Sequence, residues 1–206
     1  MTENEDLVLK EDSMPQEKSK DNKEKKNEST SALRDFVEIV DAIIIAIVSA
    51  VLVLSLVFRT GYVDGPSMNS TMSDGDRYIV SGLFYTPKAG DIVVFQPEMS
   101  AEDYSLWVKR IIATEGQTVD INGDGAVYVD GVRITEPYLD SYQKTLPKSY
   151  SNIEFPLTVP EGTVFVLGDN RLDSTDSRNI GYIDTRKILG KVLFRFAPLD
   201  SFGIVN

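Results

Sequence analysis

The run AIIIAIVSAVLVLSLVF, residues 42–58, contains no charged residue and separates two unlike parts of the chain. As a helix it spans about 25 Å, and the apolar flank from Phe36 extends it toward the roughly 30 Å of a hydrocarbon core. A buried core helix rarely lacks a polar face for so long. A cleavable signal peptide fits poorly, because the polar segment 1–35 precedes the run and no Ala-x-Ala site ends it. The run therefore predicts an uncleaved transmembrane anchor helix over residues 36–58.

The segment before the anchor, residues 1–35, is rich in Lys and Glu and almost free of aromatic residues. Such a segment buries too little apolar surface to offset its ordering entropy, which predicts a disordered tail. More basic residues lie close before the anchor (Lys23, Lys25, Lys26 and Arg34) than close after it (Arg59 and Arg77). The positive-inside rule then predicts a single-pass protein of the cell membrane, with a cytoplasmic N-terminus and an extracytoplasmic domain over residues 59–206.

The segment after the anchor is typical of β structure. Val127-Tyr128-Val129-Asp130-Gly131-Val132-Arg133-Ile134 predicts a hairpin, because Asp-Gly suits the positive φ angles of a type I′ turn. Short branched and aromatic runs predict further strands at 78–80, 92–95, 108–112, 164–167 and 192–194. No sustained helical period follows residue 60, and residues 140–155 indicate a long loop or an insertion at a sheet edge. The predicted fold is mainly β, an antiparallel domain with a small β-rich cap over roughly 114–163.

The composition excludes several classes of function. The 206 residues include no His and no Cys, which removes thiol nucleophiles, thiolate metal sites and the commonest zinc ligand. The net charge is −11, and no basic block lies outside the N-terminal tail, so nucleic acid is not an expected partner. No metal and no cofactor is expected.

Ser67 lies in the turn Val63-Asp64-Gly65-Pro66-Ser67-Met68, just past the anchor. A sharp turn can project a hydroxyl for nucleophilic attack, although a serine at such a place is more often only a turn residue. A chain without histidine cannot supply the imidazole of a Ser-His-Asp triad. A nucleophilic Ser67 would therefore need another base.

Lys109, in the segment Trp107–Ile112, is the candidate base. A lysine normally has a pKa near 10.4 and holds its proton, but burial disfavours the charged form. In a strand, Trp107, Lys109 and Ile111 share one face, which surrounds the amine with apolar groups. A pKa of about 8 would need roughly 3 kcal/mol of differential destabilisation of the ammonium, which desolvation can supply. The alternative is a lysine whose head reaches water from a strand edge.

A third polar cluster, residues 168–178 (GDNRLDSTDSR), directly follows an apolar run that predicts a strand. A polar loop explains the composition, since Asp, Asn and Ser favour turns. The polar-loop interpretation does not explain why so many hydrogen-bond donors and acceptors directly follow a predicted core strand. Asp169 or Asp176 could pair with Arg178, and Ser174 could orient a neutral lysine amine by hydrogen bonding.

Together these segments resemble type I signal peptidases, the membrane-anchored Ser-Lys proteases that remove signal peptides from exported proteins. The resemblance covers about residues 36–200 and follows the family's order, in a short chain like the Gram-positive form. It rests on the anchor and on five motifs: 65–68 (GPSM), 90–95 (GDIVVF), 108–112 (VKRII), 127–131 (VYVDG) and 168–178 with Gly181. One such motif is only moderately specific, whereas five in order after an anchor are specific.

The resemblance implies a role for each matching residue. Ser67 would be the nucleophile, Lys109 the general base, and Ser174 the residue that holds the lysine amine. Asp169, Asp176 and Arg178 would maintain the site, while Met68, Pro66 and Trp107 would line the substrate cleft. Some relatives have an oxyanion-hole hydroxyl where this chain has Gly65, so a backbone N–H would serve there together with that of Ser67. The family usually has Met-x-Pro-Thr-Leu after the serine, and this chain has Met68-Asn69-Ser70-Thr71-Met72.

The expected function is removal of N-terminal signal peptides from exported preproteins at a bilayer, with the protein-export machinery as a further partner. Two alternatives stay open. A self-cleaving Ser-Lys protein of the repressor type shares the dyad, but this N-terminus carries a tail and an anchor. A catalytically silent homologue could instead assist surface-protein or pilus assembly.

Overall fold

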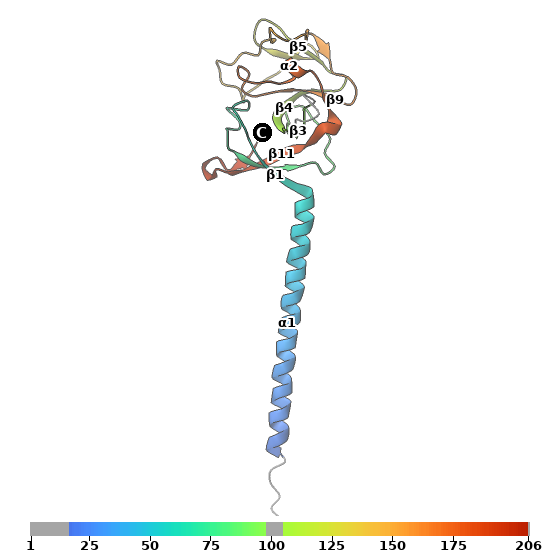
Figure 1. The fold of residues 1–206 in the computed structure, drawn as a ribbon, viewed down its shortest axis with the longest axis vertical. Coiled ribbons are helices and arrows are strands. Elements are labelled where there is room, and N and C mark those ends of the chain that lie inside the picture. The colour runs from blue at the N-terminus through green and yellow to red at the C-terminus, as the bar shows by residue number, and fades with distance from the viewer. Residues whose placement is uncertain (1–16, 98–104, 206) are drawn as a thin grey trace, which may run out of the picture. The chain divides into compact units, whose positions relative to one another are not determined.

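The computed structural model describes residues 17–97 and 105–205, with side chains described from residue 33 onward. The chain divides into a helical unit that ends at Val53 and a β unit that begins at Leu54 (Figure 1). Helix α1, Glu17–Val57, makes up the described part of the first unit; its last four residues belong to the second unit and are followed by strand β1, Phe58–Tyr62.

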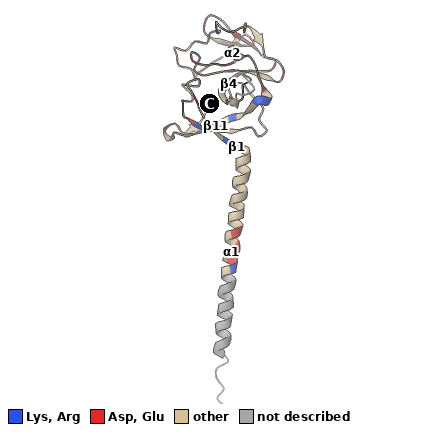
Figure 2. Cartoon of the chain, viewed as in Figure 1, with Lys and Arg blue, Asp and Glu red and all other residues tan. Residues whose placement is uncertain are grey.

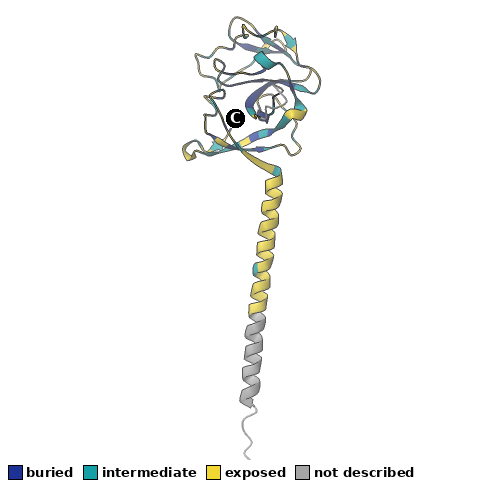
Figure 3. Cartoon of the chain, in the orientation of Figure 1, coloured by how far each residue is buried: buried dark blue, intermediate teal, exposed yellow. Residues whose placement is uncertain are grey.

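Helix α1 is apolar over Leu33–Val57, a 25-residue stretch that is long and apolar enough to cross a membrane. Figure 2 shows the charged residues of its described part in one band, followed by an uncharged stretch that reaches β1. The side chains of this stretch are exposed almost throughout (Figure 3), so it is not the core helix of a folded domain.

The helix begins earlier than predicted. Residues 17–35 were expected to be disordered, yet α1 starts at Glu17. Lys and Glu are good helix formers, so a polar segment can continue a helix that an apolar run stabilises. The predicted disorder of residues 1–16 lies outside the described residues.

The larger of two sheets is antiparallel and has the strand order β1-β2-β11-β3-β4-β9-β10, with β12 paired to β11. Its strands after β1 are β2 (Arg77–Ser81), β3 (Ile92–Phe95), β4 (Trp107–Thr114), β9 (Thr163–Leu167), β10 (Ile183–Asp184), β11 (Ile188–Ala197) and β12 (Gly203–Ile204). The five strands predicted from apolar runs are therefore confirmed, each of them as long as predicted or longer in the structure.

A second sheet of four strands, ordered β7-β6-β5-β8, occupies the predicted cap region. Its strands are β5 (Thr118–Ile121), β6 (Val127–Val129), β7 (Val132–Arg133) and β8 (Leu157–Thr158). The predicted hairpin is confirmed: β6 pairs with β7, and Asp130 and Gly131 between them have φ angles of 53° and 78°. A long segment without strands, residues 134–156, connects β7 to β8.

Both faces of the larger sheet are buried at its centre, where strands β3, β4 and β9 carry apolar residues on both sides. Val93, Phe95 and Ile111 pack on one face. On the other face, Ile92 and Val94 pack with residues of the β1–β2 region, and Phe165 and Leu167 pack against the second sheet. The central strands β3, β4 and β9 are thereby fixed, and β4 carries Lys109.

Short helices complete the described fold. Helix α2, Ser177–Ile180, begins at a capping box in which Asp176 accepts from Arg178 N–H and Asn179 accepts from Asp176 N–H. Two 3₁₀ turns are Thr185–Lys187 and Leu199–Ser201. The sequence did not predict α2, because one turn is too short to show a helical period.

Candidate active site

Ser67 lies in the turn between β1 and β2, and this turn is held from both sides. Met68 is fully buried in the core on one side of it. On the other side, Asn170 donates its backbone N–H to Ser67 O (3.0 Å) and its side-chain amide to Pro66 O (3.1 Å). The nucleophile turn is thus fixed by the loop that follows β9.

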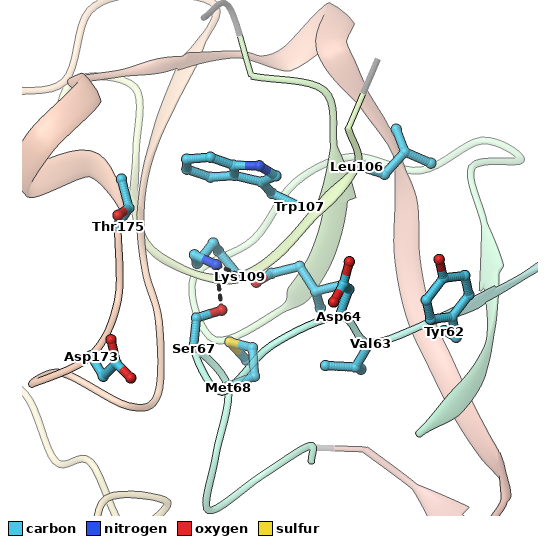
Figure 4. A pocket seen from close by; sticks show the side chains of 11 residues that line it. Tyr62, Val63, Asp64, Ser67, Met68, Leu106, Trp107, Lys109, Asp173 and Thr175 are labelled. Carbon is cyan, nitrogen blue, oxygen red and sulfur yellow. Dashed lines mark hydrogen bonds between the residues drawn. The ribbon is translucent and has the colours of Figure 1, made fainter. Parts of the chain in front are cut away.

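Lys109 comes from β4, at the point where β9 leaves the sheet. Strand β9 pairs with β4 only from Arg110 onward, so Lys109 lies just beyond the last paired residue. Its Nζ is 2.7 Å from Ser67 Oγ and 3.0 Å from Val108 O. As predicted, it shares a face with Trp107, whose ring centroid is 5.3 Å from the amine (Figure 4).

The Lys109 side chain is removed from water, with 4% of the residue exposed. Burial lowers its pKa from 10.5 to about 8, against the opposing attraction of the carboxylates of Asp176 and Asp169. The alternative of a lysine head in water is therefore wrong. At neutral pH a useful fraction of this lysine is a neutral amine, which can accept a proton.

Two buried ion pairs surround the dyad. Arg110 donates to both carboxylate oxygens of Asp169, at 2.9 and 2.7 Å. Arg178 makes a second bidentate pair with Asp176, at 2.8 Å to each oxygen. Burial by itself would raise the pKa of Asp176, but the Arg178 guanidinium, the backbone N–H of Gly168 and the Ser174 hydroxyl together outweigh it and the pKa is lowered. Of the two partners considered for Arg178, Asp176 is the one observed, and Asp169 pairs with Arg110.

The hydroxyl of Ser174 does not make the predicted bond to the lysine amine. Ser174 is buried, and its Oγ makes no hydrogen bond of good geometry among the described residues, although it lies close enough to Asp176 to help lower the pKa of that carboxyl. It lies against Gly168, where a Cβ would come within 2.2 Å of Ser174 Oγ and 2.5 Å of Ser67 O. The chain can therefore bring Ser174, Gly168 and Ser67 together only because residue 168 has no side chain.

The backbone N–H of Gly65 is not free for an oxyanion. It donates to Asp74 Oδ1 at 2.8 Å, which corrects the expectation that it serves the oxyanion hole. Within the described residues, Ser67 N–H has no hydrogen-bond acceptor. The nucleophile's own N–H is thus the available donor.

The dyad opens into a cleft of about 240 Å³ (Figure 4). Met68 and Trp107 line it, as predicted for substrate-binding residues. Pro66 does not line it, and its carbonyl accepts from Asn170 instead. Within the described residues, no cluster of three or more Asp and Glu side chains is arranged to hold a metal ion.

The backbone conformation at residue 70 is incompatible with the proline that the usual motif has there. Ser70 has a φ of 81°, and a proline ring fixes φ near −65°. Its hydroxyl donates to Asn69 O at 2.6 Å and to Tyr138 O at 3.0 Å. This turn is therefore built differently from one that contains proline, and its side chain contacts the segment that follows β7.

Part of that segment falls in the loop predicted over residues 140–155, but its contacts with the site were not predicted; we call residues 136–146 the strap. Glu136 and Thr145 both accept from the Arg171 guanidinium, and Leu146 O accepts from Arg178 at 3.3 Å. Tyr138 stacks on the Arg110 guanidinium, with its ring centroid 3.8 Å from Cζ. A buried arginine on an apolar strand, such as Arg110, was the available sequence signal, because it requires a partner.

Comparison with known proteins shows the family of this chain. Residues 36–197 match the family described as signal peptidase, peptidase S26. The chain belongs to this family. A signal peptidase I of Bacillus amyloliquefaciens is 40% identical over 167 residues, which cover 78% of this chain and 84% of that protein.

Other members of the signal peptidase family match over similar lengths. A probable signal peptidase I of Synechocystis is 38% identical, covering 81% of this chain and 85% of that protein. Signal peptidase I S of Bacillus subtilis is 34% identical, covering 88% of this chain and all of that protein. A crystal structure of a signal peptidase I from Enterococcus faecalis is 34% identical and covers 52% of this chain and 97% of that one, with a TM-score of 0.41.

Proposed function

We propose that this signal peptidase cleaves preproteins with Ser67 as nucleophile and Lys109 as general base. The observation that carries the proposal is the 2.7 Å separation between Ser67 Oγ and Lys109 Nζ. The Lys109 pKa of about 8 supports the proposal further, because part of the lysine is then a neutral amine that can accept a proton at neutral pH. A nucleophile within hydrogen-bond reach of a base of suitable pKa is the requirement for activating a serine.

The reaction would proceed in two stages. Ser67 Oγ attacks the carbonyl carbon of the scissile bond as Lys109 takes its proton, and the oxyanion is stabilised by Ser67 N–H. The lysine ammonium then protonates the leaving amine, which becomes the N-terminus of the mature protein. In the second stage Lys109 takes a proton from water, which attacks the acyl carbon; the acyl–Oγ bond then breaks, the lysine ammonium returns the proton to Ser67 Oγ, and the signal peptide leaves with a new carboxylate.

Ser174 is proposed as a positioning residue for the charged lysine. Its buried hydroxyl makes no hydrogen bond of good geometry in the resting arrangement, which is unfavourable for a polar group. During the reaction Lys109 becomes an ammonium with three donors, and a nearby acceptor would steady it. The ion pairs of Asp169 and Asp176 would hold the strand and loop that bring these groups together.

The substrates are proposed to be N-terminal signal peptides, as the names of the relatives indicate for those proteins. The apolar part of α1 would hold the enzyme at the membrane in which the signal peptide lies, which raises their effective concentration. We further propose that the N-terminus is cytoplasmic and residues 59–206 are extracytoplasmic, from the basic residues that precede the anchor. Contact with the export machinery remains a prediction, and a silent assembly partner is not favoured by these relatives.

The decisive test compares Ser67→Ala and Lys109→Met with the wild-type chain on a purified preprotein in detergent. Each variant should lose activity by about 10³-fold or more, because the nucleophile and the base act as a unit and neither supports catalysis without the other. Lys88→Met, at an exposed position, is the matched control and should keep wild-type activity. Processing at the wild-type rate by either dyad variant would refute the assignment.

A further inference from the structure

Two carboxylates share the cleft with the dyad. Asp64 and Asp173 both line it, together with Ser67 and Lys109. Both residues are exposed, and neither carboxylate has a hydrogen bond or an ion pair within the described part of the chain. Their charges are therefore available to whatever enters the cleft.

The backbones that carry these carboxylates are held in place. Next to Asp64, Val63 exchanges backbone hydrogen bonds with the β2 side of the turn, to Asp76 O at 2.8 Å and from Gly75 at 2.9 Å. At the other position, Asp173 N–H donates to Asn170 Oδ1 at 3.3 Å. The backbone of each residue is therefore held in place, while its carboxylate remains available to a ligand, as a recognition group requires.

The two carboxylates lie on opposite sides of the nucleophile. In Figure 4 Asp173 is on one side of Ser67, and Asp64 is on the other side with Tyr62. A substrate strand that runs along this line, with its scissile carbonyl at Ser67, passes one carboxylate before the bond and the other after it.

No fixed positive charge among the lining residues balances this pair. Lys109 is the one basic residue that lines the cleft; with a pKa of about 8 it is mostly protonated at neutral pH, so at most one positive charge faces two carboxylates. The whole chain is also acidic, with a net charge of −11, so the surrounding field has the same sign.

We propose that Asp64 and Asp173 are specificity-determining residues that favour basic substrate side chains on the two sides of the scissile bond and disfavour acidic ones. The proposal rests on the proposed function, since it places the bond at Ser67. Opposite charges across a recognition surface attract the right partner, and like charges reject the wrong one.

The experiment uses the purified full-length protein and peptides that differ only in carrying Lys, Gln or Glu at one position near the cleavage site. The measured quantity is the ratio of kcat/KM for the Lys peptide to that for the Glu peptide, position by position. For wild type we expect a ratio on the order of 10 at one position on each side, falling as salt is added. Asp173→Asn should bring the ratio close to 1 on one side only, and Asp64→Asn on the other side only.

Asp200→Asn is the control, because it removes the same charge from an exposed position outside the cleft. It should leave every ratio unchanged. A wild-type ratio near 1 at all positions, or ratios unchanged in both cleft variants, would overturn the proposal.

These outcomes are separable from failure of the proposed function. If either cleft variant slows all peptides equally, its carboxylate acts on the dyad and not on selection, and the specificity proposal fails while the Ser-Lys mechanism stands. If Ser67→Ala still cleaves the peptides, the mechanism itself fails.

Discussion

At the scale of single residues, the chemistry depends on how Lys109 is kept from water. Desolvation disfavours its ammonium form, while Asp176 and Asp169 favour it, and desolvation is the larger effect. Lowering the pKa from 10.5 to about 8 corresponds to roughly 3 kcal/mol between the two protonation states. The same burial that is unfavourable to the charged lysine makes it a base.

This pKa predicts the pH dependence of catalysis. Because the neutral amine is the active form, kcat/KM should rise with pH, with a midpoint of about 8, and level off above it. The neutral fraction increases about tenfold from pH 7 to pH 9, and activity should follow it. A rate profile with a peptide that does not itself titrate measures this. Activity that stays constant down to about pH 5 would contradict the role of Lys109.

Gly168 gives a second prediction at this scale. A Cβ at residue 168 would overlap Ser174 Oγ and the carbonyl oxygen of Ser67, so Gly168→Ala must displace the nucleophile turn or the loop after β9. A small displacement of a catalytic group can cost about 10²-fold in rate. We expect a loss of this size in kcat, measured on a preprotein.

The matched control is Gly123→Ala, since a Cβ there meets no atom within 4 Å and the residue has no positive φ. It should keep both activity and thermal stability. If the two substitutions lowered kcat equally, the close contact at Gly168 would not be the cause of the lost activity.

At the scale of elements, the strap connects three segments that carry the site. It contacts the nucleophile turn through Ser70, strand β4 through Arg110, and the loop after β9 through Arg171. Arg171 is 1% exposed, so its guanidinium depends on the acceptors that surround it.

The strap predicts the effect of Glu136→Gln. This variant leaves the buried Arg171 guanidinium without its charged partner, a change that typically costs about 3–5 kcal/mol of unfolding free energy. Backbone amides of the strap should exchange with solvent faster, and denaturant unfolding should occur earlier. Asp184→Asn, which breaks the exposed Arg186 pair, should change little. Equal effects of the two variants would mean that the strap is not held by Arg171.

At the scale of the whole molecule, one apolar helix precedes a β domain, and the family match spans both, from residue 36 to residue 197. The function requires that the dyad and the signal peptide meet at the same membrane surface. Orientation therefore decides whether the proposed site can reach exported substrates.

Orientation is testable by cysteine labelling, because the chain contains no cysteine. Asp200→Cys, at an exposed position of the β domain, should react with a membrane-impermeant maleimide in intact cells. Ser29→Cys, before the anchor, should react only after the membrane is opened. The reverse pattern would place the β domain in the cytoplasm and contradict the proposed topology.

Local patterns in the amino-acid sequence were sufficient to predict most elements, whereas Ser67 and Lys109 were singled out by the resemblance to type I signal peptidases. The uncharged run at 42–58, the short apolar runs of the strands and the Asp-Gly turn are such patterns, and they encode local structure. The absence of histidine removes the imidazole base, but composition and strand pattern left Lys109 open between a base and a lysine whose head reaches water. The early start of α1 was missed because composition cannot tell a disordered polar tail from the polar end of a longer helix.

Which polar groups meet depends on the tertiary fold. Arg110 pairs with Asp169, and Glu136 with Arg171, across separations in the chain that no spacing rule covers. The engaged N–H of Gly65, the unbonded hydroxyl of Ser174 and the positive φ of Ser70 are likewise consequences of packing. The physical reason is that buried polar groups take the partners that the folded core brings within reach, and that choice depends on the whole arrangement of strands.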